Sequence, residues 1–131
     1  DMIERATVYL EKAQESVAGA QSELANRRYN NCANRCYYAC FQAAVAALER
    51  ADVRPGGEQW SHKSVPAQFD GLLIYRRKLC PPELRGTLVS TYELRQMADY
   101  RQRSVPQAEA RRALRRASAF VQAVQEQGAT S

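Results

Sequence analysis

Apolar side chains recur at alternating intervals of three and four residues near the start of the chain, and this pattern restricts the fold more than any other feature. The positions are Ile3, Ala6, Leu10, Ala13, Val17, Ala20 and Leu24. Such spacing gathers side chains on one face of an α-helix, so the segment predicts a long amphipathic helix. The stripe is short for an isolated coiled coil, and its small alanines favour a closely packed partner helix, as in a helical bundle.

Four more helices are predicted after this one. Their approximate bounds are residues 29–51, 65–75, 82–99 and 105–127, with a polar, glycine-containing or proline-containing break between each helix and the next. The alternating pattern of a half-buried strand does not occur. The predicted fold is therefore all-α, an up-and-down bundle of four long helices and one shorter helix, and we expect one domain over residues 1–131.

The overall composition bears on where such a chain resides. Apolar residues make up 45% of it, which argues against disorder. No apolar run reaches the roughly 18 residues of a membrane-spanning helix, so no contact with a membrane is expected. The first residues also lack the apolar stretch of a secretory signal peptide. We therefore expect a cytoplasmic protein.

Three of the four cysteines, Cys32, Cys36 and Cys40, follow one another at intervals of four residues. This spacing places them in one stripe along a helix, where about 12 Å of helix rise separates the first from the last. That distance is too large for the two to share a metal ion. We expect buried, reduced cysteines and neither a metal nor a cofactor.

Positive charge is concentrated in the last third of the chain. The net charge is +5, and seven arginines lie between positions 95 and 116, against two acidic residues in the same span. Because arginine grips phosphate through a planar fork, this region is a candidate nucleic-acid surface. A solvated basic helix face explains the same pattern and remains the alternative. The candidate nucleic-acid contacts are Arg101, Arg103, Arg111, Arg112 and Arg115.

Arg95, Asp99 and Tyr100 form a second candidate group, at the end of the fourth predicted helix. Arg95 and Asp99 are four residues apart and therefore share a helix face. Arg95 also falls on the side that is expected to point inward, where an unpaired charge is costly. It would hold a phosphate, with Asp99 orienting it, or form only an ion pair with Asp99. Tyr100 would stack on a base, bond a phosphate or seal the core.

His62 is the single histidine and lies just before the third predicted helix. It is a candidate general base near neutral pH. The alternative is a structural residue that caps a helix or bonds a backbone carbonyl. The sequence contains no Gly-rich phosphate loop, no HExxH motif and no nucleophile elbow. The candidate catalytic residues are therefore Arg95, Asp99, Tyr100 and His62.

The order of several segments resembles the HEPN domain family. The segments are Tyr9–Ala13, Asn34–Ala44, Ser61–Val65, Tyr92–Tyr100 and Ala117–Val121. Together they extend over nearly the whole chain. The adjacent pair Tyr37 and Tyr38 and the Arg-x3-Asp-Tyr segment are the most specific parts of the resemblance.

The resemblance implies a bundle that forms a homodimer through its central helices. Several HEPN proteins are metal-independent endoribonucleases that act as toxins or defence effectors. They are often encoded beside a nucleotidyltransferase that serves as the antitoxin. Their active site is an arginine followed a few residues later by a histidine. In that scheme Arg95 matches the arginine and would stabilise the charged phosphorane.

The chain departs from this pattern because Asp99 and Tyr100 stand where the histidine is expected. It resembles a HEPN subgroup that carries arginine followed by Asp-Tyr, and His62 would supply a base only if the fold brings it near. Two hypotheses remain open. In the first, the Arg95 cleft binds RNA or a nucleotide and cleaves RNA within a toxin–antitoxin or defence pair. In the second, the chain is a non-catalytic interaction module that docks a nucleotidyltransferase or another partner.

Overall fold

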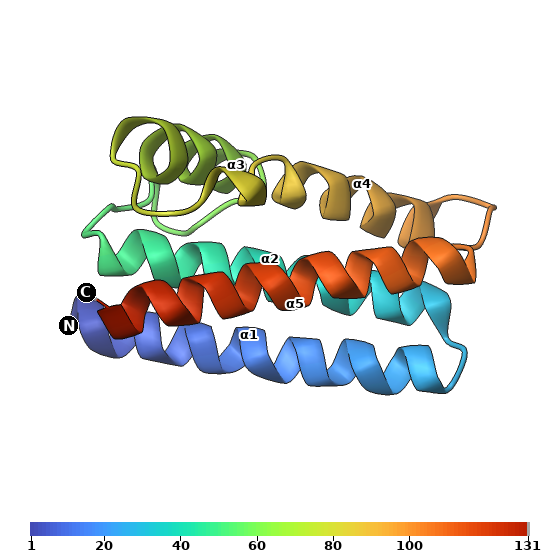
Figure 1. Ribbon diagram of the computed structural model, residues 1–131. Helices are drawn as coiled ribbons and strands as arrows, with labels where there is room; N and C mark the ends of the chain where they lie inside the picture. The colour runs from blue at the N-terminus through green and yellow to red at the C-terminus, as the bar shows by residue number, and fades with distance from the viewer. Residues whose placement is uncertain (131) are drawn as a thin grey trace.

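The computed structural model describes residues 1–130, and the elements of this part are helices (Figure 1). Four long helices lie side by side: α1 (Met2–Ala25), α2 (Tyr29–Arg50), α4 (Thr87–Tyr100) and α5 (Gln107–Thr130). The third segment combines a short α3 (Ser64–Gln68) with the π-helix η1 (Phe69–Arg76), and a single 3-10 turn, η2 (Pro82–Leu84), precedes α4. The predicted all-α bundle is confirmed.

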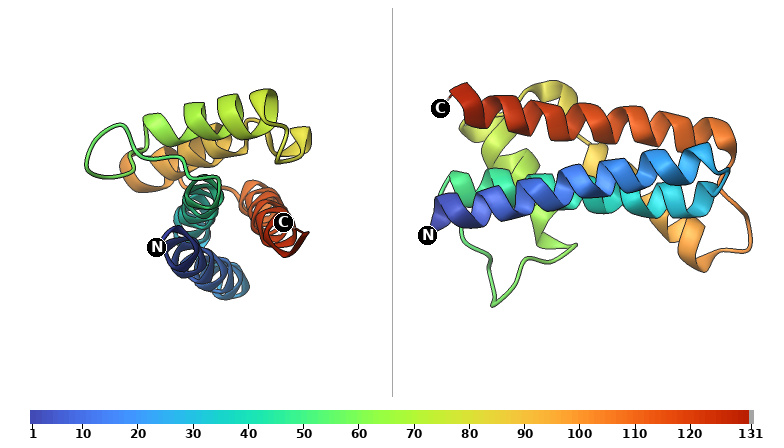
Figure 2. Two further views of the ribbon diagram at one scale, coloured as in Figure 1. Left: turned by 90° about the vertical axis from the view of Figure 1, so that its left-hand side faces the viewer. Right: turned by 90° about the horizontal axis from the view of Figure 1, so that it is seen from below.

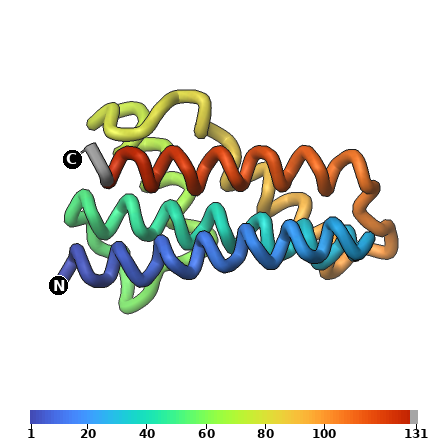
Figure 3. The backbone as a smooth tube through the Cα atoms, turned by 60° about the horizontal axis from the view of Figure 1, so that its bottom comes forward, coloured from blue at the N-terminus to red at the C-terminus, as the bar shows by residue number. Residues whose placement is uncertain are grey.

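α2 is the central element of the bundle. Figure 2 shows it end-on between α1, α5 and the layer that contains α3 and α4, and it packs against all of these helices. Small residues such as Ala33, Ala39 and Ala43 are fully buried along it and allow the neighbouring backbones to come close. Figure 3 shows that α1 begins and α5 ends at one end of the bundle, while the α1–α2 turn and the α4–α5 loop lie at the other.

The predicted stripe of α1 faces α2 and α5 except at its first position. Ala6, Ala13 and Ala20 are buried, and Leu10 and Val17 pack against the core. Ile3 is 67% exposed, so the prediction that it points inward is wrong. None of the helices in the described part of the chain has the length and hydrophobicity needed to cross a bilayer.

The third segment differs from the predicted α-helix because it widens into a π-helix. Pro66 is the third residue of α3, so its missing N–H falls in the first turn, where no intrahelical acceptor is available. Phe69 and Ile74 are five residues apart and both buried. A π-helix bonds residues five apart, which brings these two side chains to the same side of the helix.

Two other predicted boundaries are wrong. The fourth helix begins at Thr87 rather than near residue 82, because Arg85 is extended and Gly86 has φ +80°, a left-handed conformation that glycine adopts most readily. The predicted end of the last helix at residue 127 places Gly128 just beyond it, but the helix continues to Thr130. Glycine in a helix costs up to about 1 kcal/mol relative to alanine, which does not suffice to end a well-packed helix.

The core is closed on the α5 side by an aromatic pair. Phe69 of η1 and Phe120 of α5 are fully buried, and their ring centroids lie 4.9 Å apart. This contact joins the third segment to the last helix, across the face of α2.

We expect Phe120→Ala to lower the free energy of unfolding by about 3–5 kcal/mol, because it leaves a large cavity against Phe69. Val89 on α4 is 47% exposed, so Val89→Ala should change stability by no more than about 0.5 kcal/mol. Urea denaturation followed by circular dichroism measures both variants. Equal stability of the two would contradict this view of the core.

Candidate functional site

The centre of the candidate site is the side chain of Arg95, which extends from α4 toward α2. Only 12% of this side chain is exposed. Its guanidinium carbon lies 5.6 Å from the ring centroid of Tyr37, 5.3 Å from that of Tyr38 and 6.0 Å from that of Tyr92. Each ring face attracts the cation, by about 0.5–2 kcal/mol depending on how far water is excluded. The three rings therefore compensate part of the cost of removing the guanidinium from water.

Asp99 pairs with Arg95 one helical turn further on, as the sequence predicts. The Asp99 Oδ2 atom lies 3.3 Å from Arg95 Nε and also accepts a hydrogen bond of 2.9 Å from Asn34 Nδ2 on α2. The contact with Arg95 is an ion pair without hydrogen-bond geometry, since Arg95 Nε is buried and donates to no acceptor. The Arg95 side chain donates no hydrogen bond to a described residue, and of its three nitrogens only Nε is buried without a partner, so the two terminal nitrogens remain available to a ligand.

The fold brings His62 into contact with the same aromatic group. The imidazole stacks on Tyr92 with ring centroids 5.9 Å apart, and it lies 5.4 Å from Tyr37 and 5.0 Å from Phe41. The Tyr37 hydroxyl and His62 Nδ1 are hydrogen-bonded. The loop before α3 thus carries a histidine to the rings that surround Arg95.

The environment of His62 favours its neutral form. Although the residue as a whole is exposed, the partial burial of its ring lowers the pKa of His62, and the nearby Arg95 cation lowers the same pKa further. Burial also raises the pKa of the Tyr37 hydroxyl above its ordinary value, so that group keeps its proton. A hydroxyl both donates and accepts. When Nδ1–H donates to the Tyr37 oxygen, Nε2 is unprotonated and can take a proton. When the Tyr37 hydroxyl instead donates to Nδ1, the imidazole proton is on Nε2, which is then a donor.

A buried carboxylate holds the loop that carries His62. Glu49, near the end of α2, is 5% exposed and accepts hydrogen bonds from Trp60 Nε1 at 3.2 Å and from Arg5 Nε at 2.8 Å. A second cation, Arg54, lies 3.7 Å from the same carboxylate. Trp60 stands two residues before His62, so this network fixes the loop against α2.

Tyr100 does not join the cluster. It is 71% exposed at the end of α4, which is incompatible with the proposed role of sealing the core. Arg101 and Arg103 follow in the exposed α4–α5 loop, and the three other predicted contacts, Arg111, Arg112 and Arg115, are exposed on α5. Within the described residues, none of these arginines contacts the rings around Arg95. Arg116, by contrast, donates to Ser90 at 2.6 Å and links α5 to α4.

The cluster contains residues that sequence reasoning did not assign to it. Asn34, Tyr37, Tyr38 and Phe41 follow one another at intervals of three, one and three along α2, so they lie on adjoining faces of that helix. This spacing was a usable signal for a polar–aromatic surface. Their partner Tyr92 lies on α4, three residues before Arg95.

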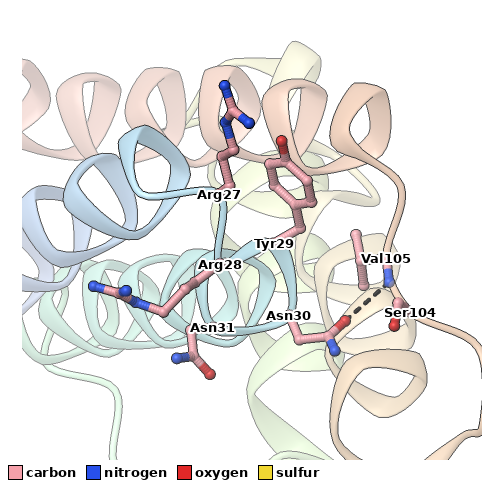
Figure 4. A pocket seen from close by; sticks show the side chains of 7 residues that line it. All are labelled: Arg27, Arg28, Tyr29, Asn30, Asn31, Ser104 and Val105. Atoms are coloured by element: carbon pink, nitrogen blue, oxygen red, sulfur yellow. Dashed lines mark hydrogen bonds between the residues drawn. The ribbon is translucent and has the colours of Figure 1, made fainter.

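A second polar region lies at the α1–α2 turn, where a pocket of about 300 Å³ is lined by residues of the turn and by Ser104 and Val105. Figure 4 shows that Arg27 and Tyr29 point to the opposite side from Asn31, so the side chains do not converge on one point. The Asn30 side chain accepts a hydrogen bond of 2.9 Å from the Val105 N–H. This hydrogen bond gives the region a structural role, because it ties the turn to the residues just before α5.

The four cysteines are buried and form no disulfide. Cys32 and Cys36 Sγ atoms lie 4.0 Å apart along α2. In residues 1–130, no group of three or more histidine, cysteine, aspartate or glutamate side chains is arranged to hold a metal ion.

Comparison with known families gives one decisive result. The model of the HEPN domain matches residues 6–127, which is nearly the whole chain. The chain belongs to the HEPN domain family. No protein of curated function matches it. In this HEPN protein, Arg95 occupies the centre of the cluster described above, and His62 approaches it from outside α4.

The lowered pKa of His62 leads to a prediction for stability. A histidine with a lower pKa in the folded state binds fewer protons there than in the unfolded chain, whose histidine pKa is about 6.5. The free energy of unfolding should therefore be highest above that value and should fall as the pH drops through it. Urea denaturation at about pH 7.5 and about pH 5.5 measures this decrease in the free energy of unfolding. We expect the decrease to be smaller in His62→Gln than in the wild-type protein. An equal loss in the variant would contradict the assignment.

Proposed function

We propose that this HEPN protein binds RNA through the Arg95 cluster and cleaves it without a metal ion. The observation that carries the proposal is the position of Arg95, a nearly buried cation with unused hydrogen-bond donors, beside the imidazole of His62. A phosphate group is the ligand whose charge and acceptor oxygens such an arginine suits best. A nucleotide phosphate offers the same chemistry and would compete for the site.

The roles of the residues in cleavage follow from their chemistry. His62 Nε2 would take the proton of a ribose 2′-hydroxyl while the 2′-oxygen forms a bond to the adjacent phosphorus. The bond from phosphorus to the 5′-oxygen then breaks, the 5′-oxygen takes a proton from water, and a 2′,3′-cyclic phosphate remains. Arg95 would stabilise the charge that develops on the phosphorane oxygens. Asp99 would orient Arg95, since its carboxylate lies 3.3 Å from Arg95 Nε.

For the oligomeric state, the biological role and the partner protein, the support is family membership alone. We propose that the chain acts as a homodimer and that it is a toxin or defence effector, with a nucleotidyltransferase as the antitoxin. The arginines from Arg101 to Arg115 would add contacts to the RNA backbone outside the cluster.

Binding tests the role of Arg95. We expect Arg95→Ala to weaken binding of a labelled 2′-O-methyl RNA, which cannot be cleaved, by about tenfold or more, because a charged hydrogen bond contributes about 1.5–3 kcal/mol. Arg95→Lys keeps the charge but loses the fork and should bind with intermediate affinity. Arg76 is exposed at the end of η1, and Arg76→Ala is the control for the loss of one charge. With the helical fold intact by circular dichroism, equal affinity of Arg95→Ala and Arg76→Ala would remove Arg95 from the site.

Cleavage of end-labelled RNA in EDTA tests the role of His62. The wild-type protein should produce fragments that end in a 2′,3′-cyclic phosphate, and His62→Gln should slow cleavage about a hundredfold or more while binding persists. Lys63→Gln alters the neighbouring exposed residue of the same loop and should leave the rate nearly unchanged.

Binding without any cleavage by the wild-type protein would contradict the catalytic part of the proposal. It would favour the alternative, a non-catalytic module whose Arg95 cluster holds a ligand or docks a partner.

A further inference from the structure

A small polar pocket lies beside the Arg95 cluster, between α1 and α2. It has a volume of about 300 Å³ and is lined by Gly19, Glu23, Asn31, Asn34 and Arg35. This volume is at the lower end of the range for small-molecule sites and matches a compact planar group.

The pocket is joined to the Arg95 cluster through two residues. Asn34 lines the pocket and also donates to Asp99, the partner of Arg95. Arg35 lies against Tyr38, with its guanidinium carbon 5.3 Å from the ring centroid, the same distance at which Arg95 lies from that ring. A ligand that places a phosphate at Arg95 would therefore have its adjoining nucleoside within reach of the pocket.

The pocket offers acceptors and donors that other residues leave unused. Glu23 Oε2 accepts from Arg28 Nε at 2.7 Å and from Asn31 Nδ2 at 3.3 Å, whereas no described residue donates to Glu23 Oε1. Arg35 Nη2 donates to Asn34 Oδ1 at 2.7 Å, and its other two nitrogens donate to no described acceptor. The hydrogen bond from Arg28 lowers the pKa of Glu23, so the carboxylate is ionised at neutral pH and acts only as an acceptor.

This combination of groups distinguishes among the RNA bases. Guanine presents two neighbouring donors, N1–H and the N2 amino group, beside the acceptor O6, with N7 as a further acceptor. Glu23 Oε1, with two unused lone pairs, accepts from these donors, and the Arg35 guanidinium donates to the acceptors. Adenine, cytosine and uracil each present at most one donor group on that edge, so each would leave a carboxylate lone pair or a guanidinium donor unmatched.

We propose that the pocket formed by Glu23, Asn31, Asn34 and Arg35 receives a guanine base of the RNA strand whose phosphate lies at Arg95. The assignment rests on the proposed RNA binding and adds its base preference. Glu23 reads the donor edge of the base and Arg35 its acceptors. Gly19 contributes no side chain to the pocket, and a Cβ there would make van der Waals contact with Arg35, 3.5 Å from its Cδ atom.

Two short 2′-O-methyl RNAs that differ only by guanine or adenine at one position test the assignment by fluorescence anisotropy. The wild-type protein should bind the guanine RNA about five- to a hundredfold more tightly. Glu23→Gln should bring this ratio close to one. Because Glu23→Gln removes a negative charge, it should not weaken binding of the adenine RNA. The control is Glu15→Gln on the exposed side of α1, which changes the charge by the same amount.

A second variant tests the pocket without changing any charge. Gly19→Met should fill the space next to Arg35 and thereby reduce the preference for guanine RNA over adenine RNA. Methionine also has a higher helix propensity than glycine, so α1 should remain folded. The absence of a guanine preference in the wild-type protein, or its persistence in both variants, would overturn the assignment. If Arg95→Ala still weakened binding of both RNAs, the proposed RNA binding would stand without the guanine assignment. If the wild-type protein bound neither RNA, both proposals would fall.

Discussion

The burial of Arg95 among tyrosine rings is the interaction on which the arrangement of the candidate site depends. A guanidinium that loses most of its water needs compensation, and here ring faces and one carboxylate provide it. Neither interaction uses the hydrogen-bond donors of the guanidinium. The structure thus holds a cation in a fixed place while leaving its directional binding capacity to a ligand.

The packing of α2 against α4 produces this arrangement. Tyr37 and Tyr38 come from α2, while Tyr92, Arg95 and Asp99 come from α4, so the site forms only when the two helices are paired. The loop before α3 then adds His62, and the Glu49–Trp60 hydrogen bond holds that loop against α2. Small buried residues along α2 also contribute to the site, because they allow α1, α4 and α5 to pack closely against that helix.

The parts of this architecture that depend on local spacing could be predicted from the sequence. The stripe from Ala6 to Leu24 indicated α1, and the four-residue interval between Arg95 and Asp99 indicated their ion pair. Two departures from the prediction lie where tertiary packing outweighs a local signal: α5 continues through Gly128, and the third segment widens into a π-helix that buries both Phe69 and Ile74. The approach of His62 to Arg95 could not be predicted, since it depends on the path of a loop and on a buried contact with Glu49.

The central claim is that the fold places His62 on the same tyrosine rings as Arg95, near enough for the cation to act on the imidazole. An NMR titration measures this most directly, because the chain has one histidine and its imidazole signals need no further assignment. We expect the pKa of His62 to lie below its ordinary value of 6.5 in the wild-type protein and to rise in Arg95→Gln, with Arg76→Gln as the control. A pKa at or above 6.5 that is the same in all three proteins would contradict the account.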